Sequence, residues 1–82
     1  MDYYVYLVEC SDGTYYCGYT NDLEARINEH NISKIGAKYT KSRRPVRLVY
    51  SEKFDTKKKA MKREHRIKKL RRNDKLALFI NK

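Results

Sequence analysis

The chain has little cysteine and no long apolar run, and each absence excludes a class of protein. Its only cysteines are Cys10 and Cys17. Without a secretion signal we expect both to be reduced, and with His30 and His65 they are too few for a zinc site. No apolar stretch approaches the ~18 residues that span a bilayer. The first residues also lack the basic start and the cleavage site of a signal peptide. We therefore expect a cytoplasmic protein with no membrane partner.

Basic side chains are scarce at the start of the chain and abundant afterwards. Residues 1–30 carry one basic side chain, Arg26, and six acidic ones, whereas residues 31–82 carry nineteen basic and four acidic ones. Solubility does not require so large a surplus of positive charge. A polyanion would neutralise it, and nucleic acid is the commonest polyanion that proteins bind. We expect a nucleic acid as partner, most of all DNA.

Hydrophobic periodicity predicts strands and helices in the order β-β-α-β-α-α, within one domain that spans residues 1–82. The predicted strands are 3–9, 14–20 and 46–54, and the predicted helices, which follow caps at Asn21, at Asp55 or Thr56 and at Asn73, are 22–30, 57–70 and 74–80. Residues 31–45 form a long basic loop, and a loop of that length in a small domain is more often functional than idle. A chain this short buries one modest core, so its site should be shallow and open.

The turn Ser11-Asp12-Gly13 sets the register of the first two strands. A two-residue turn would put Tyr6 and Tyr16 on opposite faces of the hairpin. A three-residue loop with Gly13 in the left-handed conformation would pair Val8 with Tyr16, and the two tyrosines would then share a face. We favour the three-residue loop, which also directs Cys10 and Cys17 to opposite faces.

Arg26 and His30 lie one turn apart on the first predicted helix, just after a hairpin that is rich in tyrosine. A guanidinium binds phosphate oxygens through two donors, and an imidazole can tune or deprotonate a nearby phenol. The simpler interpretation is a solvated helix face beside tyrosines that are selected only for their β-propensity. Spacing alone favours neither strongly.

Glu64 falls on the apolar face of the second predicted helix, together with Ala60, Ile67 and Arg71. A carboxylate in such a position needs a partner. One possibility is a salt bridge to Arg26 or to a neighbouring lysine. The other is a hard divalent cation such as Mg²⁺, which binds one or two carboxylates, water and substrate phosphate. The sequence leaves both open.

Taken together, these residues resemble the GIY-YIG nuclease superfamily. Tyr4-Val5-Tyr6 is similar to the first motif and Tyr16-Cys17-Gly18 to the second, while Arg26, His30 and the segment 64–68 follow in the family's order. The likeness covers nearly the whole chain. It is greatest to small single-domain bacterial members of uncharacterised role, and it extends to the nuclease domain of the eukaryotic structure-specific endonuclease that cuts branched DNA.

The resemblance implies an α+β fold with a small three-stranded antiparallel sheet flanked by helices. It also implies a site composed of Tyr6, Tyr16, Arg26, His30 and Glu64. Glu64 would hold one divalent cation, Mg²⁺ or Mn²⁺, and Arg26 would clamp the phosphate. Either Tyr6, helped by His30, or Tyr16 would activate the attacking water. The basic side chains that we expect on DNA phosphates are Lys38, Lys41, Arg43, Arg44, Arg47 and Lys68.

Three functional hypotheses follow. The leading one is a divalent-metal-dependent endonuclease that hydrolyses DNA phosphodiesters and is directed by DNA shape or by a protein partner rather than by sequence. The second is a nucleic-acid-binding module that keeps the site with little or no turnover. The third is a basic accessory protein in which the tyrosines and Glu64 are structural. Both of the first two need a basic surface, so charge cannot separate them.

Overall fold

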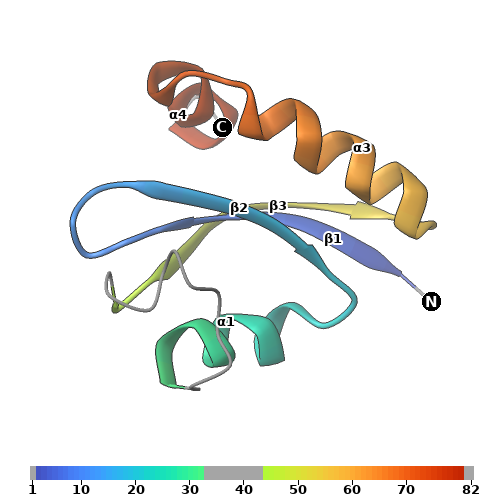
Figure 1. Ribbon diagram of the computed structural model, residues 1–82, viewed down its shortest axis with the longest axis horizontal. Coiled ribbons are helices and arrows are strands. Elements are labelled where there is room, and N and C mark those ends of the chain that lie inside the picture. Colours follow the sequence, from blue (N-terminus) through green and yellow to red (C-terminus); the bar gives the residue numbers. More distant parts are fainter. Residues whose placement is uncertain (1, 33–43, 81–82) are drawn as a thin grey trace.

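The computed structural model describes residues 2–32 and 44–80 of the chain. Its strands and helices, labelled as in Figure 1, are β1 (Tyr3–Glu9), β2 (Tyr15–Thr20), α1 (Leu23–Ile32), β3 (Arg47–Phe54), α3 (Lys57–Lys68) and α4 (Arg72–Ile80). The predicted order β-β-α-β-α-α is confirmed, as is the α+β class. No helix in the described ranges is long and apolar enough to cross a membrane.

The strands form one antiparallel sheet in the order β2-β1-β3. Val8 lies opposite Tyr16, which confirms the three-residue loop and the shared face of Tyr6 and Tyr16. Gly13 has a φ of 83°, the left-handed conformation that a glycine adopts without steric cost. The backbone nitrogens of Gly13 and Cys10 close the turn by donating to the carbonyl oxygens of Cys10 (3.0 Å) and Thr14 (2.8 Å).

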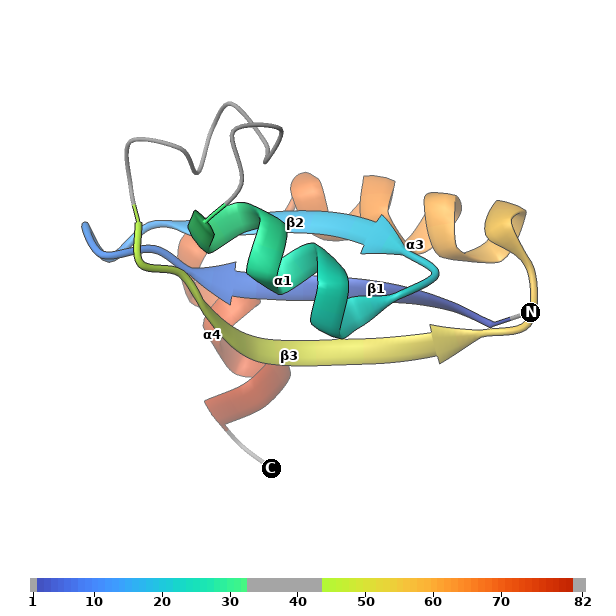
Figure 2. The same cartoon turned by 90° about the horizontal axis from the view of Figure 1, so that it is seen from below.

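Helices cover both faces of the sheet, with α1 on one face and α3 and α4 on the other (Figure 1). Because side chains alternate along a strand, β1 contributes to two separate cores. The α3 face buries Val5, Leu7, Cys17, Ala60 and Ile67, and the α1 face buries Tyr6, Val8, Cys10 and Val46. Cys10 and Cys17 therefore point to opposite faces, as predicted, and both are free thiols. Figure 2, seen from the α1 side, shows α3 behind the sheet and alongside β2.

The ends of the helices differ from the predictions in three places. Asp22, not Asn21, caps α1, since its Oδ1 accepts from the nitrogen of Ala25 at 3.2 Å. The helix also continues through Asn31 and Ile32, which were assigned to the loop. The helix α4 begins at Arg72, so Asn73 lies inside it rather than before it. Thr56 does cap α3, where its hydroxyl accepts from the nitrogen of Lys59 at 3.2 Å.

Candidate active site

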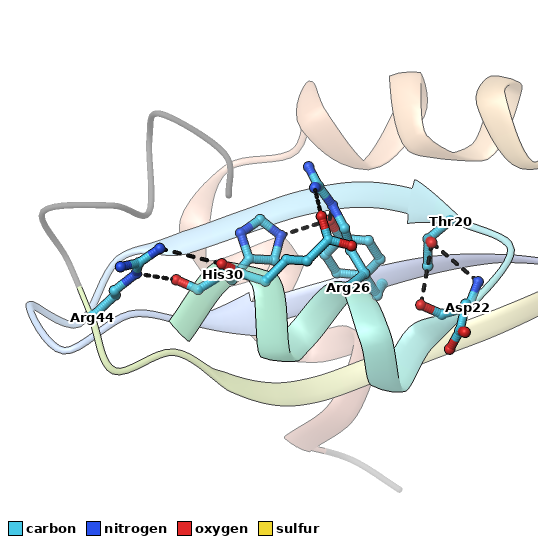
Figure 3. A network of polar contacts seen from close by, with 7 residues as sticks. Thr20, Asp22, Arg26, His30 and Arg44 are labelled. Atoms are coloured by element: carbon cyan, nitrogen blue, oxygen red, sulfur yellow. Dashed lines mark hydrogen bonds and ion pairs between the residues drawn. The ribbon is translucent and has the colours of Figure 1, made fainter. Parts of the chain in front are cut away.

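A buried phenol and a buried imidazole meet between β1 and α1. The Tyr6 hydroxyl lies 2.8 Å from Nε2 of His30, and both side chains are almost fully excluded from solvent. Nε of Arg26, one helical turn before His30, donates to the same hydroxyl at 3.4 Å. Figure 3 shows Arg26 and His30 extending from α1, with the Arg26 guanidinium on the side of the helix next to β2. The structure thus brings together three of the predicted residues around a single oxygen atom.

Gly18 makes room for this arrangement. It lies opposite Tyr6 in the β1–β2 ladder, on the face that Tyr6 occupies. A Cβ atom on Gly18 would come within 2.4 Å of the Tyr6 hydroxyl and 2.7 Å of Cζ, closer than nonbonded atoms approach. The φ of Gly18 is not positive, so the glycine is required for space rather than for its backbone conformation. The sequence carried a signal for this role, because a glycine inside a strand often marks a close approach.

Burial fixes the protonation of the pair at neutral pH. Loss of solvent raises the pKa of Tyr6 to about 12, although Arg26 opposes the shift. Burial, assisted by the positive charge of Arg26, lowers the pKa of His30 to about 4. A protonated phenol that accepts from Arg26 has its own proton to donate, and Nε2 of the neutral imidazole is the acceptor. The ring proton of His30 is then on Nδ1.

Tyr16 and Lys68 connect this buried group to α3. The half-buried Tyr16 ring meets the edge of His30 with centroids 5.3 Å apart. Nζ of Lys68 lies 5.9 Å from the centroid of Tyr16 and 3.7 Å from a carboxylate oxygen of Glu64. The backbone oxygen of Glu64 also lies 4.0 Å from Sγ of Cys17 on β2. Glu64 therefore reaches the same edge of the sheet as Tyr16, although α3 covers the opposite face.

The ion pair of Glu64 is with Lys68 and not with Arg26. The side chains are 18% and 49% exposed, so water and ligands have access to the pair. Arg26 has a different carboxylate partner, Glu29, at 3.4 Å, and its own side chain is 27% exposed. The structure thus keeps both charged groups, a guanidinium and a carboxylate, close to the surface beside β2.

Glu64 has the donor chemistry that a hard divalent cation needs. Among the described residues no cluster of three or more histidine, cysteine or acidic side chains exists that could enclose a metal. A single accessible carboxylate nevertheless suits Mg²⁺, which keeps several waters and binds substrate phosphate through its remaining positions. Glu64 also borders an open hollow of about 930 Å³ on the surface of α3, so its carboxylate is not enclosed. The residues present fit such an ion.

The residues predicted to contact DNA occupy different environments. Arg44 binds the last turn of α1, donating to the carbonyl oxygen of Glu29 at 3.2 Å and to that of His30 (Figure 3). Arg47 is 75% exposed and pairs with Glu9 at 2.5 Å. Lys68 lies at the candidate site, and Lys38, Lys41 and Arg43 fall outside the described residues.

Sequence reasoning did not single out Asn31. Its side chain accepts from the nitrogen of Val46 at 2.6 Å and donates to the oxygen of the same residue at 3.1 Å. Together with Arg44, it fastens the end of α1, and therefore His30, to the start of β3. Nothing in the sequence marks this asparagine apart from its position near a helix end.

The comparison with family models identifies the domain. Residues 2–77 match the GIY-YIG catalytic domain. The chain belongs to the GIY-YIG family. Tyr6, Gly18, Arg26, His30 and Glu64 therefore lie in a nuclease-family domain.

Individual relatives match over most of their length. The UPF0213 protein VNG_2274C of Halobacterium salinarum is 57% identical over 77 residues, which are 94% of this chain and 99% of that protein. The UPF0213 protein SSP2268 of Staphylococcus saprophyticus is also 57% identical over 77 residues, 94% of this chain and 93% of that protein. Among solved structures, the NMR structure of the UPF0213 protein BH0048 from Bacillus halodurans is 46% identical, with a TM-score of 0.63 over all of this chain and 86% of that one. This GIY-YIG chain is thus similar to small proteins of nearly its own size.

Proposed function

We propose that this GIY-YIG protein is a divalent-metal-dependent endonuclease that hydrolyses DNA phosphodiester bonds. The observation that carries the proposal is the direct contact of Tyr6, Arg26, His30 and Tyr16, with Glu64 held at the same sheet edge through Lys68. A protein that used these side chains only for stability would not need a guanidinium and a carboxylate accessible beside one another.

Arg26 and Glu64 would act on the scissile phosphate from two sides. The guanidinium of Arg26 would bind nonbridging oxygens and stabilise the negative charge that increases during displacement. Glu64 would hold a Mg²⁺ or Mn²⁺ ion, which when bound supplies polarisation of the phosphate and stabilisation of the leaving oxygen. Lys68, within 3.7 Å of Glu64, would contribute a second positive charge for the substrate.

Burial separates the roles of the two tyrosines. Tyr6 is 1% exposed, its pKa is raised to about 12, and its oxygen is already bound to His30 and Arg26. Such a phenol positions Arg26 and does not accept a proton readily from bulk water. Tyr16 is half-buried and lies between His30 and Lys68, so we assign it the contact with the attacking water. Accordingly, Tyr16→Phe should lower kcat with little effect on stability, whereas Tyr6→Phe should lower both.

Cleavage of synthetic DNA tests the proposal. Nicked, branched, duplex and single-stranded DNA would be incubated with the protein in Mg²⁺, in Mn²⁺ or in EDTA. Cleavage is expected only with metal, and Glu64→Gln should abolish it while DNA binding in EDTA persists. Glu24→Gln is the matched control, because Glu24 is an exposed carboxylate on α1. Full activity of Glu64→Gln would eliminate the metal-ligand role, and DNA binding without cleavage of any substrate would favour the non-catalytic binding module.

A further inference from the structure

The surface of α3 next to Glu64 carries a cationic hollow. Its volume is about 930 Å³, and it is bordered by Glu64 and lined by four exposed cations, Lys57, Lys58, Lys62 and Arg66. We call this surface, together with Met61 and His65, the α3 hollow. It lies on the outer side of the helix, away from the buried Ala60 and Ile67.

The cations of the hollow differ from the other cations of α3. Lys59, Arg63 and Lys68 each have a carboxylate partner, at 3.0, 2.8 and 3.7 Å. Lys57, Lys58, Lys62 and Arg66 form no ion pair with any residue in the described part of the chain. Four adjacent like charges repel one another, and an external polyanion would relieve that repulsion.

An apolar side chain lies among these charges. Met61 is 45% exposed and lines the hollow together with His65, one helical turn further on. Duplex DNA would present phosphates and sugars to such a surface and keep its bases stacked inside. A single strand presents unpaired bases, which pack on apolar side chains and stack on imidazole or guanidinium planes. Met61 and His65 are therefore of more use to a single strand than to a duplex.

The hollow is continuous with the candidate active site through Glu64. This residue borders the hollow on one side and contacts Lys68, which lies over Tyr16, on the other. We propose that the α3 hollow binds a single-stranded segment adjoining the bond to be cut, with its phosphates on the four cations and an unpaired base against Met61 and His65. The assignment of the cut site rests on the function proposed above. The substrate would then be DNA with a single-stranded extension or flap.

Binding in EDTA tests this inference separately from catalysis. Fluorescence anisotropy would compare a blunt duplex with the same duplex carrying a single-stranded extension. The wild-type protein should prefer the extended DNA, and Met61→Ser should reduce that preference by roughly 5-fold or more, the lower limit for loss of one stacked base. His65→Ala should have the same effect, and urea unfolding of both variants would confirm that they fold.

Two lysines on the same helix test the charged part of the hollow. Lys62→Gln should weaken binding of the extended DNA and reduce the slope of log K against log salt by ~0.7, as expected for one lost phosphate contact on a single strand. Lys59→Gln, outside the hollow and paired with Asp55, should leave the preference for the extension unchanged. Equal affinity for both DNAs in the wild type, or an unaltered preference in both Met61→Ser and His65→Ala, would overturn the inference even if Glu64-dependent cleavage were observed. A preference that depends on Met61 would support it even if no DNA were cut.

Discussion

Replacement of Gly18 by alanine perturbs the candidate site without removing any polar group. The added Cβ would lie 2.4 Å from the Tyr6 hydroxyl, 2.7 Å from Cζ and 3.1 Å from Cε2. Two of these distances are below what real Cβ atoms show, so the Tyr6 ring or the β2 backbone has to shift. Because Tyr6 is 1% exposed and packed among Val8, Cys10 and Val46, the ring has no open space to enter.

The expected cost combines overpacking with a damaged hydrogen bond. Forcing an extra methyl group into a well-packed core destabilises a protein by about 1–3 kcal/mol. Displacement of the Tyr6 hydroxyl from Nε2 of His30 would add about 1 kcal/mol, since both groups are buried. We therefore expect Gly18→Ala to lower the free energy of unfolding by about 2–4 kcal/mol and to reduce any nuclease activity, because Arg26 loses its contact with Tyr6.

The measurement needs a matched glycine. Gly13→Ala is suitable, because a φ of 83° makes alanine unfavourable there while the nearest side-chain atom, on Arg72, is 3.8 Å away. That variant should lose about 1 kcal/mol of stability and keep the wild-type NMR shifts of the His30 ring. In Gly18→Ala the ring shifts should change, together with the midpoint of urea unfolding. Wild-type stability and wild-type His30 shifts in Gly18→Ala would refute the argument that the glycine is required for space.

Three further predictions concern stability. The free energy of unfolding should fall by about 1 kcal/mol between pH 7.5 and 5.5, because unfolded His30 binds a proton near pH 6.5 and folded His30 binds one only near its lowered pKa of about 4. This contribution is complete above pH 6.5 and lost as the pH falls toward 4, and urea titrations of His30→Gln should lack it. Arg44→Ala should cost about 2 kcal/mol in urea unfolding, since it removes the charged donor to two carbonyl oxygens of α1; an unchanged midpoint would mean that water caps the helix equally well. Thr56→Ala should cost about 1 kcal/mol through loss of the α3 cap, whereas Thr56→Ser should be near wild type.

The sheet could be predicted well because its determinants are local. Alternation of apolar residues located β1 without error, and the left-handed Gly13 fixed the pairing of Val8 with Tyr16. Helix caps were less certain. Asn21 and Asp22 are both good capping residues, and the choice depends on the Thr20 hydroxyl, which accepts from the Asp22 nitrogen at 3.1 Å (Figure 3). That contact exists only once β2 has ended and the chain has turned toward α1.

The candidate site was predictable as a set of residues but not as a network. The order of the tyrosines, Arg26, His30 and Glu64 was visible in the sequence. The partner of Glu64 was not, because lysine and arginine are abundant near it and only the packing of α3 on β2 selects Lys68. Arg44 illustrates the same limit. Its charge predicts a phosphate contact, yet the fold places it on the carbonyl oxygens of α1, and sequence spacing holds no information about that encounter.

Burial divides the candidate site into a neutral interior and a charged rim. In the interior, a phenol with a raised pKa and an imidazole with a lowered pKa remain uncharged over the same wide pH range, so their hydrogen bond does not change near neutrality. The rim holds Arg26, Lys68 and Glu64, all with partly exposed side chains. A phosphodiester carries its charge on the outside of a nucleic acid, and a water molecule has to reach it. The rim therefore has to be accessible and electrostatically active, and the interior has to keep Arg26 in place. Substitutions at the rim should thus lower kcat without unfolding the protein, whereas substitutions of the interior residues should alter stability and activity together.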